Sequence, residues 1–108
     1  MLNMAEKEIP VPAESARVTS IACLEFARNI RKSGLPHVSK RIREHVPNVI
    51  RRISDNKDGE YVTLRESEVE VLMLDSIFDM DGFDEDYANT VRKHNKAIEK
   101  HYENQINE

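Results

Sequence analysis

Residues 21–30, with the sequence IACLEFARNI, decide the fold of this chain because their apolar side chains fall on more than one face of a helix. A helix that is apolar nearly all round is usually the central, buried one. Basic residues occupy its last turn, where cations complement the helix dipole, and Gly34 and Pro36 then stop the helix. We therefore predict a buried central helix over residues 13–32.

The segment after Pro36 is predicted to be helical with an interruption. A short helix over residues 37–45 is followed by Pro47, and proline disfavours a helical conformation of the residue before it. Residues 46–53 fit either a further pair of helical turns or a strand, because apolar runs this short cannot be assigned by period alone. The Asp-Gly turn at residues 58–59 leaves one short β-hairpin near residues 50–64 as an open alternative.

Two more helices are predicted in the second half of the chain. Thr63 and Glu66 have the spacing of a capping box, which favours a helix to about Met80, while the alternation within residues 67–74 also permits a strand. A last amphipathic helix, over about residues 84–106, carries a narrow apolar stripe that resembles a coiled-coil edge. We expect this stripe to be the seam of a homo-oligomer, formed by Tyr87, Val91, Ile98 and Tyr102.

These elements predict an all-α domain, a small bundle of four or five helices over residues 13–108. Residues 1–12 are expected to form a flexible N-terminal arm, since Pro10 and Pro12 favour an extended backbone. A chain of 108 residues has room for a single modest core. The lone Cys23 fits a reducing cytoplasm, and no apolar run is long enough to span a membrane.

Charge is sorted into two blocks along the sequence. Residues 28–57 carry nine Lys or Arg and two carboxylates, a balance of +7. Residues 58–90 carry eleven carboxylates and one Arg, a balance of −10. Blocks of one sign create local fields that select partners or pair with each other, so each block is a candidate binding surface.

The acidic block predicts a face that docks onto a basic patch of a protein partner. Part of the block has a local explanation, because residues 84–86 begin the predicted last helix, where the dipole favours negative charge. The other carboxylates lack that explanation. The predicted partner-binding residues are Glu66, Glu68, Glu70, Asp75, Asp79, Asp81, Asp84, Glu85 and Asp86.

The basic block predicts an alternative surface, one that lies on the phosphates of a nucleic acid. Residues 38–43, followed by residues 50–53, the Asp-Gly turn and residues 61–64, resemble the recognition helix and hairpin of a winged-helix protein. That resemblance implies a DNA-binding transcriptional regulator of the helix-turn-helix type. The predicted nucleic-acid-binding residues are Lys40, Arg41, Arg43, Arg51 and Arg52.

The residue patterns do not favour catalysis, a cofactor or a bound metal. Three glycines form no phosphate-binding loop, and Cys23 has the apolar neighbours of a buried thiol rather than a nucleophile. The four histidines have neither a Cys pair nor the spacing of zinc ligands. Residues 55–66 and 77–88 resemble calcium-binding loops, but each lacks oxygen ligands that such a loop needs.

We therefore expect a small, acidic, non-catalytic regulatory or accessory protein of bacterial or phage type. It is expected to act in the cytoplasm by protein–protein binding through a charged surface, as a homodimer or a larger homo-oligomer. The DNA-binding regulator is the alternative. In a third interpretation the two charge blocks pair with each other, within one molecule or between copies.

Overall fold

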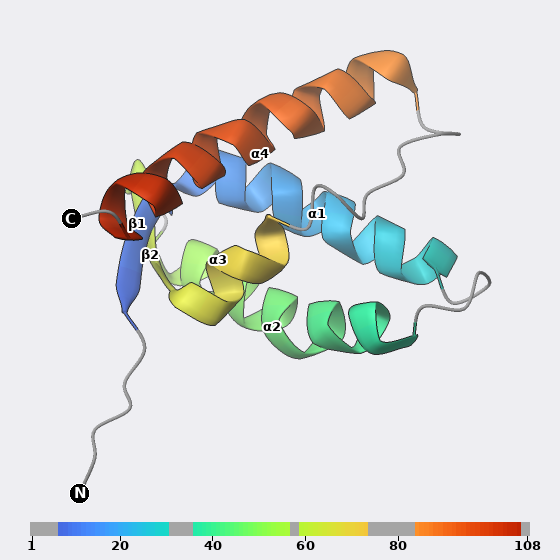
Figure 1. The fold of residues 1–108 in the computed structure, drawn as a ribbon, viewed down its shortest axis with the longest axis horizontal. Coiled ribbons are helices and arrows are strands. Elements are labelled where there is room, and N and C mark those ends of the chain that lie inside the picture. The colour runs from blue at the N-terminus through green and yellow to red at the C-terminus, as the bar shows by residue number, and fades with distance from the viewer. Residues whose placement is uncertain (1–6, 31–35, 57–58, 74–83, 107–108) are drawn as a thin grey trace, which may run out of the picture.

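The computed structural model describes residues 7–30, 36–56, 59–73 and 84–106. Within these ranges it confirms the predicted all-α bundle and adds a two-stranded antiparallel sheet at one end (Figure 1). The elements in chain order are β1 (Glu8–Pro12), α1 (Ala13–Ile30), α2 (Pro36–Asp55), β2 (Tyr61–Arg65), α3 (Glu66–Leu72) and α4 (Glu85–Ile106).

Helix α1 is the centre of the bundle, as its apolar sequence predicts. It packs against α2 on one side and α4 on the other (Figure 1). Its residues Ala16, Cys23 and Ala27 are buried in a core shared by all six elements. Burial is nevertheless not complete all round, because Ile21 and Leu24 remain exposed.

Helix α2 is continuous through Pro47, which corrects the predicted interruption. Ile42, Val46 and Val49 recur at helical spacing and are fully buried, so packing of this face holds the helix together. Pro47 lies on the exposed side, where water can solvate the carbonyl of Arg43 that the missing N–H leaves without a helical partner. Residues 46–53 are therefore helical rather than a strand.

The structure places residues 8–12 of the predicted arm in strand β1, which pairs with β2. The ladder is bracketed by two backbone hydrogen bonds, from Ala13 N–H to the Glu60 carbonyl (2.9 Å) and from Glu66 N–H to the Lys7 carbonyl (3.0 Å). Hydrogen-bonded and non-hydrogen-bonded pairs alternate in an antiparallel ladder. The pairs at residues 9 and 11 are therefore bonded, and those at residues 8, 10 and 12 are not.

This alternation explains how two prolines fit into a strand. Pro10 and Pro12 stand at non-hydrogen-bonded positions, so the ladder loses no donor to them. Ile9 and Val11 point into the core and are fully buried. β2 lies within the region predicted for a hairpin, but its partner is β1, far away in sequence, and not residues 50–53.

Helix α3 begins at Glu66 with Arg65 as its N-cap, two residues later than the Thr63 cap predicts. Thr63 belongs to β2, because Val62 and Leu64 on either side of it are buried. The carboxylate of Glu68 instead accepts the N–H of Arg65 at 2.7 Å, which satisfies a donor at the helix start. The described part of α3 confirms helix over strand as far as Leu72, and residues 74–80 of the predicted helix lie outside the described residues.

Helix α4 matches the predicted last helix and is packed by its own chain. The Asp84 carboxylate accepts the N–H of Tyr87 at its start. Val91, Asn95 and Ile98 form a fully buried stripe that faces α1 and β1. The Asn95 side-chain amide donates to the Leu72 carbonyl at 2.6 Å, which ties α4 to the end of α3.

Candidate binding surface

The predicted oligomer seam is already covered within one molecule. Val91 and Ile98 are buried in the core, and Tyr87 and Tyr102 are half-buried. Asn95, the polar residue within the narrow stripe of α4, donates its side-chain amide to the Leu72 carbonyl at the end of α3. A partner cannot reach Val91 or Ile98 while α4 stays docked.

The described acidic residues do not gather into one face. The carboxylates of Glu66 and Glu70 lie 3.4 and 3.5 Å from the Tyr102 hydroxyl, near the end of α4. Burial, followed by the charges of these two carboxylates, raises the pKa of Tyr102. Residues 84–86 stand at the other end of α4, roughly 25 Å away at 1.5 Å per residue. Asp75, Asp79 and Asp81 lie outside the described residues.

Glu68 is buried within the fold and does not contribute to an exposed acidic face. It is 2% exposed, and its carboxylate forms an ion pair with Arg52 of α2, with 3.2 Å between Oε1 and Nε. The same carboxylate oxygen accepts the Arg65 N–H. This pair joins one residue of the basic block to one of the acidic block, so pairing of the blocks within the molecule accounts for Arg52 and Glu68.

The other predicted basic residues are exposed on α2. Lys40 lies 4.0 Å from Glu44, a long contact between two exposed side chains. Within the described part of the chain, Arg41, Arg43 and Arg51 make no ion pair. A row of cations about 16 Å long at 1.5 Å per residue therefore remains open to solvent along α2.

The winged-helix resemblance does not extend to the architecture. Residues 50–53 belong to α2, and β2 pairs with β1 rather than forming a hairpin with them. Of the two segments expected to form a wing, only residues 61–64 are in a strand, and that strand belongs to the sheet with β1. The cations of α2 remain a candidate phosphate-binding row without that fold.

A surface that sequence reasoning missed lies between α1 and α2. Ile21, Leu24 and Ile50 are 41%, 36% and 36% exposed, which is unusual for large apolar side chains in so small a core. Leu24 and Ala27 of α1 line a hollow of 280 Å³ together with Arg28 and Arg43. Apolar and cationic side chains of two helices therefore meet at one place.

Another hollow lies toward the other end of both helices. Arg17 of α1 and Ile53 of α2 line this second hollow, of 460 Å³. Ile21 lies between Arg17 and Leu24 along α1, and Ile50 lies between Arg43 and Ile53 along α2. The two helices are antiparallel neighbours (Figure 1), so Ile21 on α1 and Ile50 on α2 occupy chain positions between those of the two hollows. We define the α1–α2 surface as Ile21, Leu24, Arg28, Arg43 and Ile50.

The sequence signal for this surface was present but ambiguous. Ile21, Leu24 and Arg28 recur with Arg17 at the spacing of one helical flank. An apolar flank that also carries arginines fits exposure better than full burial. Only the packing of α2 and α4 shows which flank of α1 is left uncovered.

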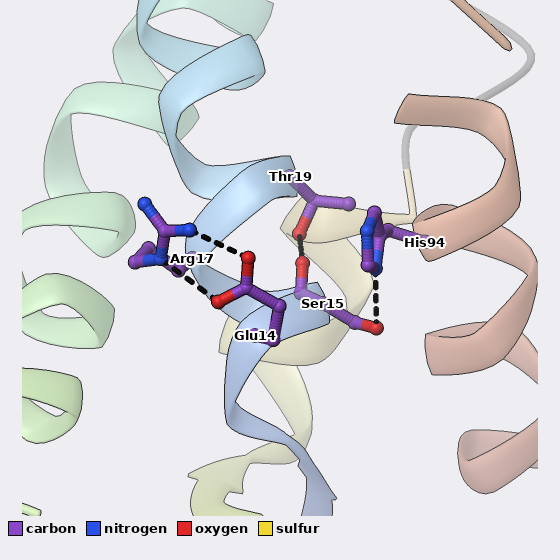
Figure 2. A network of polar contacts seen from close by, with 5 residues as sticks. All are labelled: Glu14, Ser15, Arg17, Thr19 and His94. Carbon is purple, nitrogen blue, oxygen red and sulfur yellow. Dashed lines mark hydrogen bonds and ion pairs between the residues drawn. The ribbon is translucent and has the colours of Figure 1, made fainter. Parts of the chain in front are cut away.

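A polar network joins the start of α1 to the middle of α4, as Figure 2 shows. The Ser15 hydroxyl and Nδ1 of His94 share a hydrogen bond of 2.8 Å, and the Thr19 hydroxyl donates to the Ser15 carbonyl at 2.8 Å. Glu14 and Arg17 form an ion pair at 2.5 Å on the exposed side, and the hydrogen bond from Arg17 lowers the pKa of Glu14.

The contact of Ser15 with His94 has the residue types of a nucleophile and a base. A nucleophile of this kind needs an accessible hydroxyl and a third group that orients the imidazole. Ser15 is only 4% exposed, and within the described ranges no carboxylate is hydrogen-bonded to His94. The contact therefore acts as a tie between two helices.

Neither a metal centre nor a membrane span is found among the residues that the structure describes. They contain no group of three or more His, Cys, Asp or Glu side chains placed to hold a metal ion. No described helix is long and apolar enough to cross a membrane.

Comparison with known proteins adds no relative. Neither a protein-family model nor a curated protein or solved structure matches this chain. We therefore infer a function from the α1–α2 surface and from the charges around it.

Proposed function

We propose that this chain is a non-catalytic regulatory or accessory domain that binds a protein partner through the α1–α2 surface. The observation that supports this proposal is the exposure of Ile21, Leu24 and Ile50 on α1 and α2, with Leu24 lining one hollow together with Arg28 and Arg43. Protein interfaces typically combine an apolar centre with a polar rim, and arginine is enriched in them.

The proposed surface includes Arg28 and Arg43 of the basic block and none of the acidic residues that the sequence assigns to partner binding. Glu68 is buried in an ion pair, and the described acidic residues stand at opposite ends of α4. Arg28 and Arg43 make no ion pair with the described residues, and they border exposed apolar side chains. A partner that covers this surface gains both apolar burial and charge contacts.

Selection from a displayed library of random peptides tests this function. The full chain is the target, and selected peptides are measured against the wild type, Leu24→Glu and Tyr61→Glu. Tyr61 is the matched control, because it is a 52% exposed aromatic residue on β2, outside the α1–α2 surface. We expect peptides that bind the wild type and the Tyr61 variant but lose binding to Leu24→Glu. Peptides that ignore Leu24→Glu would overturn the proposed surface.

The open cations of α2 favour a second candidate function, binding of a nucleic acid through its phosphates. Lys40, Arg41, Arg43 and Arg51 would supply the contacts, whereas Arg52 is held by Glu68. The test is the anisotropy of a fluorescent random-sequence duplex at increasing salt. Affinity that falls steeply with salt indicates phosphate neutralisation. Absence of binding at low salt removes this candidate.

We also propose that the domain works in the cytoplasm. The support is its single cysteine, which is buried and free and so cannot form an internal disulfide.

A further inference from the structure

We propose that the α1–α2 surface takes an acidic amphipathic helix of a protein partner. This inference rests on the proposed function and names the chemistry of the partner.

The exposed flank of α1 that carries Arg17, Ile21, Leu24 and Arg28 is long enough for a bound helix to lie along it. The two hollows lie near Arg17 and near Arg28, which are eleven residues apart on α1. At 1.5 Å per residue this is about 16 Å, or three helical turns. Helices bound in grooves use apolar anchors at positions i, i+3 or i+4, and i+7, which span about 10 Å. The row of Ile21, Leu24 and Ile50 can therefore receive one apolar stripe.

The walls of one hollow select the charge of that helix. Arg28 stands on the α1 wall and Arg43 on the α2 wall, and both line the same hollow. No described carboxylate forms an ion pair with Arg28 or Arg43. Glu14 and Glu60 line the other hollow, where Glu14 pairs with Arg17. Carboxylates flanking the apolar stripe of a ligand would meet these two guanidinium groups, neither of which is paired with a described residue, and guanidinium groups bind carboxylates well.

A nucleic acid matches this surface less well. Phosphates can satisfy Arg28 and Arg43, but a phosphodiester backbone offers no apolar surface to cover Ile21, Leu24 and Ile50. An acidic amphipathic helix satisfies both parts of the surface at once.

Three synthetic helical peptides test the inference. They share one stripe of Leu and Phe anchors and differ only in the flanking positions, which carry Glu, Gln or Lys. Titration calorimetry is performed with the wild-type chain and with Arg28→Gln/Arg43→Gln. The matched control is Arg65→Gln/Arg92→Gln, which removes two exposed arginines on β2 and α4, outside the α1–α2 surface. Circular dichroism confirms that each variant is folded.

We expect the Glu peptide to bind the wild type about tenfold more tightly than the Gln peptide, and the Lys peptide to bind most weakly. The preference for Glu over Gln should disappear in Arg28→Gln/Arg43→Gln and persist in the control. Equal binding of the Glu and Gln peptides would overturn the inference and leave the proposed function intact. Failure of all three peptides would overturn both.

Two further outcomes would assign the surface to another occupant. If a random DNA duplex displaces the Glu peptide with a steep salt dependence, the surface belongs to a nucleic acid. If the chain alone forms a dimer that Leu24→Glu abolishes, the surface belongs to a second copy. Either result contradicts binding of an acidic helix from a different protein.

Discussion

Glu68 has its carboxylate inside the fold rather than on an exposed binding surface. It is one of nine carboxylates that the charge pattern assigns to partner binding, yet it is almost fully buried. Its carboxylate both accepts the Arg65 N–H and pairs with Arg52. An alternating run of Glu and Val does not reveal which Glu faces the core, so this role could not be predicted from the sequence.

Replacing Arg52 should therefore destabilise the protein. Arg52→Gln leaves a buried carboxylate without its cation, and because Arg52 is partly exposed we expect a loss of about 1–3 kcal/mol in the free energy of unfolding. Urea denaturation measures it. The neighbouring Arg51→Gln is the control, since Arg51 is exposed and should change stability by less than about 0.5 kcal/mol. Equal effects of the two variants would show that the ion pair is not stabilising.

Cys23 is a second residue whose chemistry follows from its burial. The thiol is fully buried in the core, and desolvation raises its pKa to about 12. A native protein should therefore resist a disulfide reagent such as DTNB at pH 8, and labelling should proceed at the rate of unfolding. Rapid labelling of the folded chain would contradict the packing of α1.

The same burial predicts a pH dependence of stability. In the unfolded chain the pKa of the thiol is near its ordinary value of 9.0, whereas burial raises the pKa of the native thiol to about 12. Between these values the unfolded state releases a proton that the native state keeps, so stability falls as pH rises. Comparison of the wild type with Cys23→Ala over this range isolates the contribution of the thiol. A difference that stays constant with pH would contradict it.

At the scale of the elements, α1 and α4 were predictable because residues that end or cap a helix stand next to them in the sequence. Gly34 and Pro36 follow α1, and Asp84 caps the start of α4. The interruption at Pro47 was not correctly predicted, since local propensity is overridden by the burial of Ile42, Val46 and Val49 on the opposite side of α2.

Strand β1 escaped prediction for a different physical reason. Two prolines in five residues argue against a strand unless their missing donors face away from the partner, and that depends on a register with residues far away in sequence. The exposure of Ile21 and Leu24 was hidden in the same way, because it depends on where α2 and α4 pack.

Hydrogen exchange tests the register of the sheet. The N–H groups of Val62 and Leu64 lie at hydrogen-bonded positions opposite Val11 and Ile9 and should exchange slowly. The N–H of Thr63, opposite Pro10, points away from β1 and should exchange much faster. The reverse order would mean that the strand is shifted by one residue.

At the scale of the whole molecule, α4 belongs to the core of its own chain. Its buried stripe packs on α1 and β1, and Asn95 holds it to α3. The homo-oligomer that the sequence suggested would therefore need a surface other than Val91 and Ile98.

Charged substitutions in α4 should therefore unfold the protein rather than separate subunits. Val91→Asp and Ile98→Asp each place a carboxylate at a position that is at most 1% exposed, and we expect each to cost at least about 3 kcal/mol. Circular dichroism and sedimentation velocity measure folding and mass together. The exposed Asn89→Asp on the same helix is the control. If a chain carrying both Val91→Asp and Ile98→Asp stays folded and sediments with a lower mass than the wild type, that result would support the predicted oligomer seam.

The central claim is that the α1–α2 surface is where this molecule meets its partner. Titration of the ¹⁵N-labelled chain with the Glu peptide, followed by NMR chemical shifts, tests that claim most directly. We expect chemical-shift changes confined to the amides of Ile21, Leu24, Arg28, Arg43, Ile50 and their neighbours. Shifts centred instead on the first turn of α4, or spread over the molecule without saturation, would contradict it.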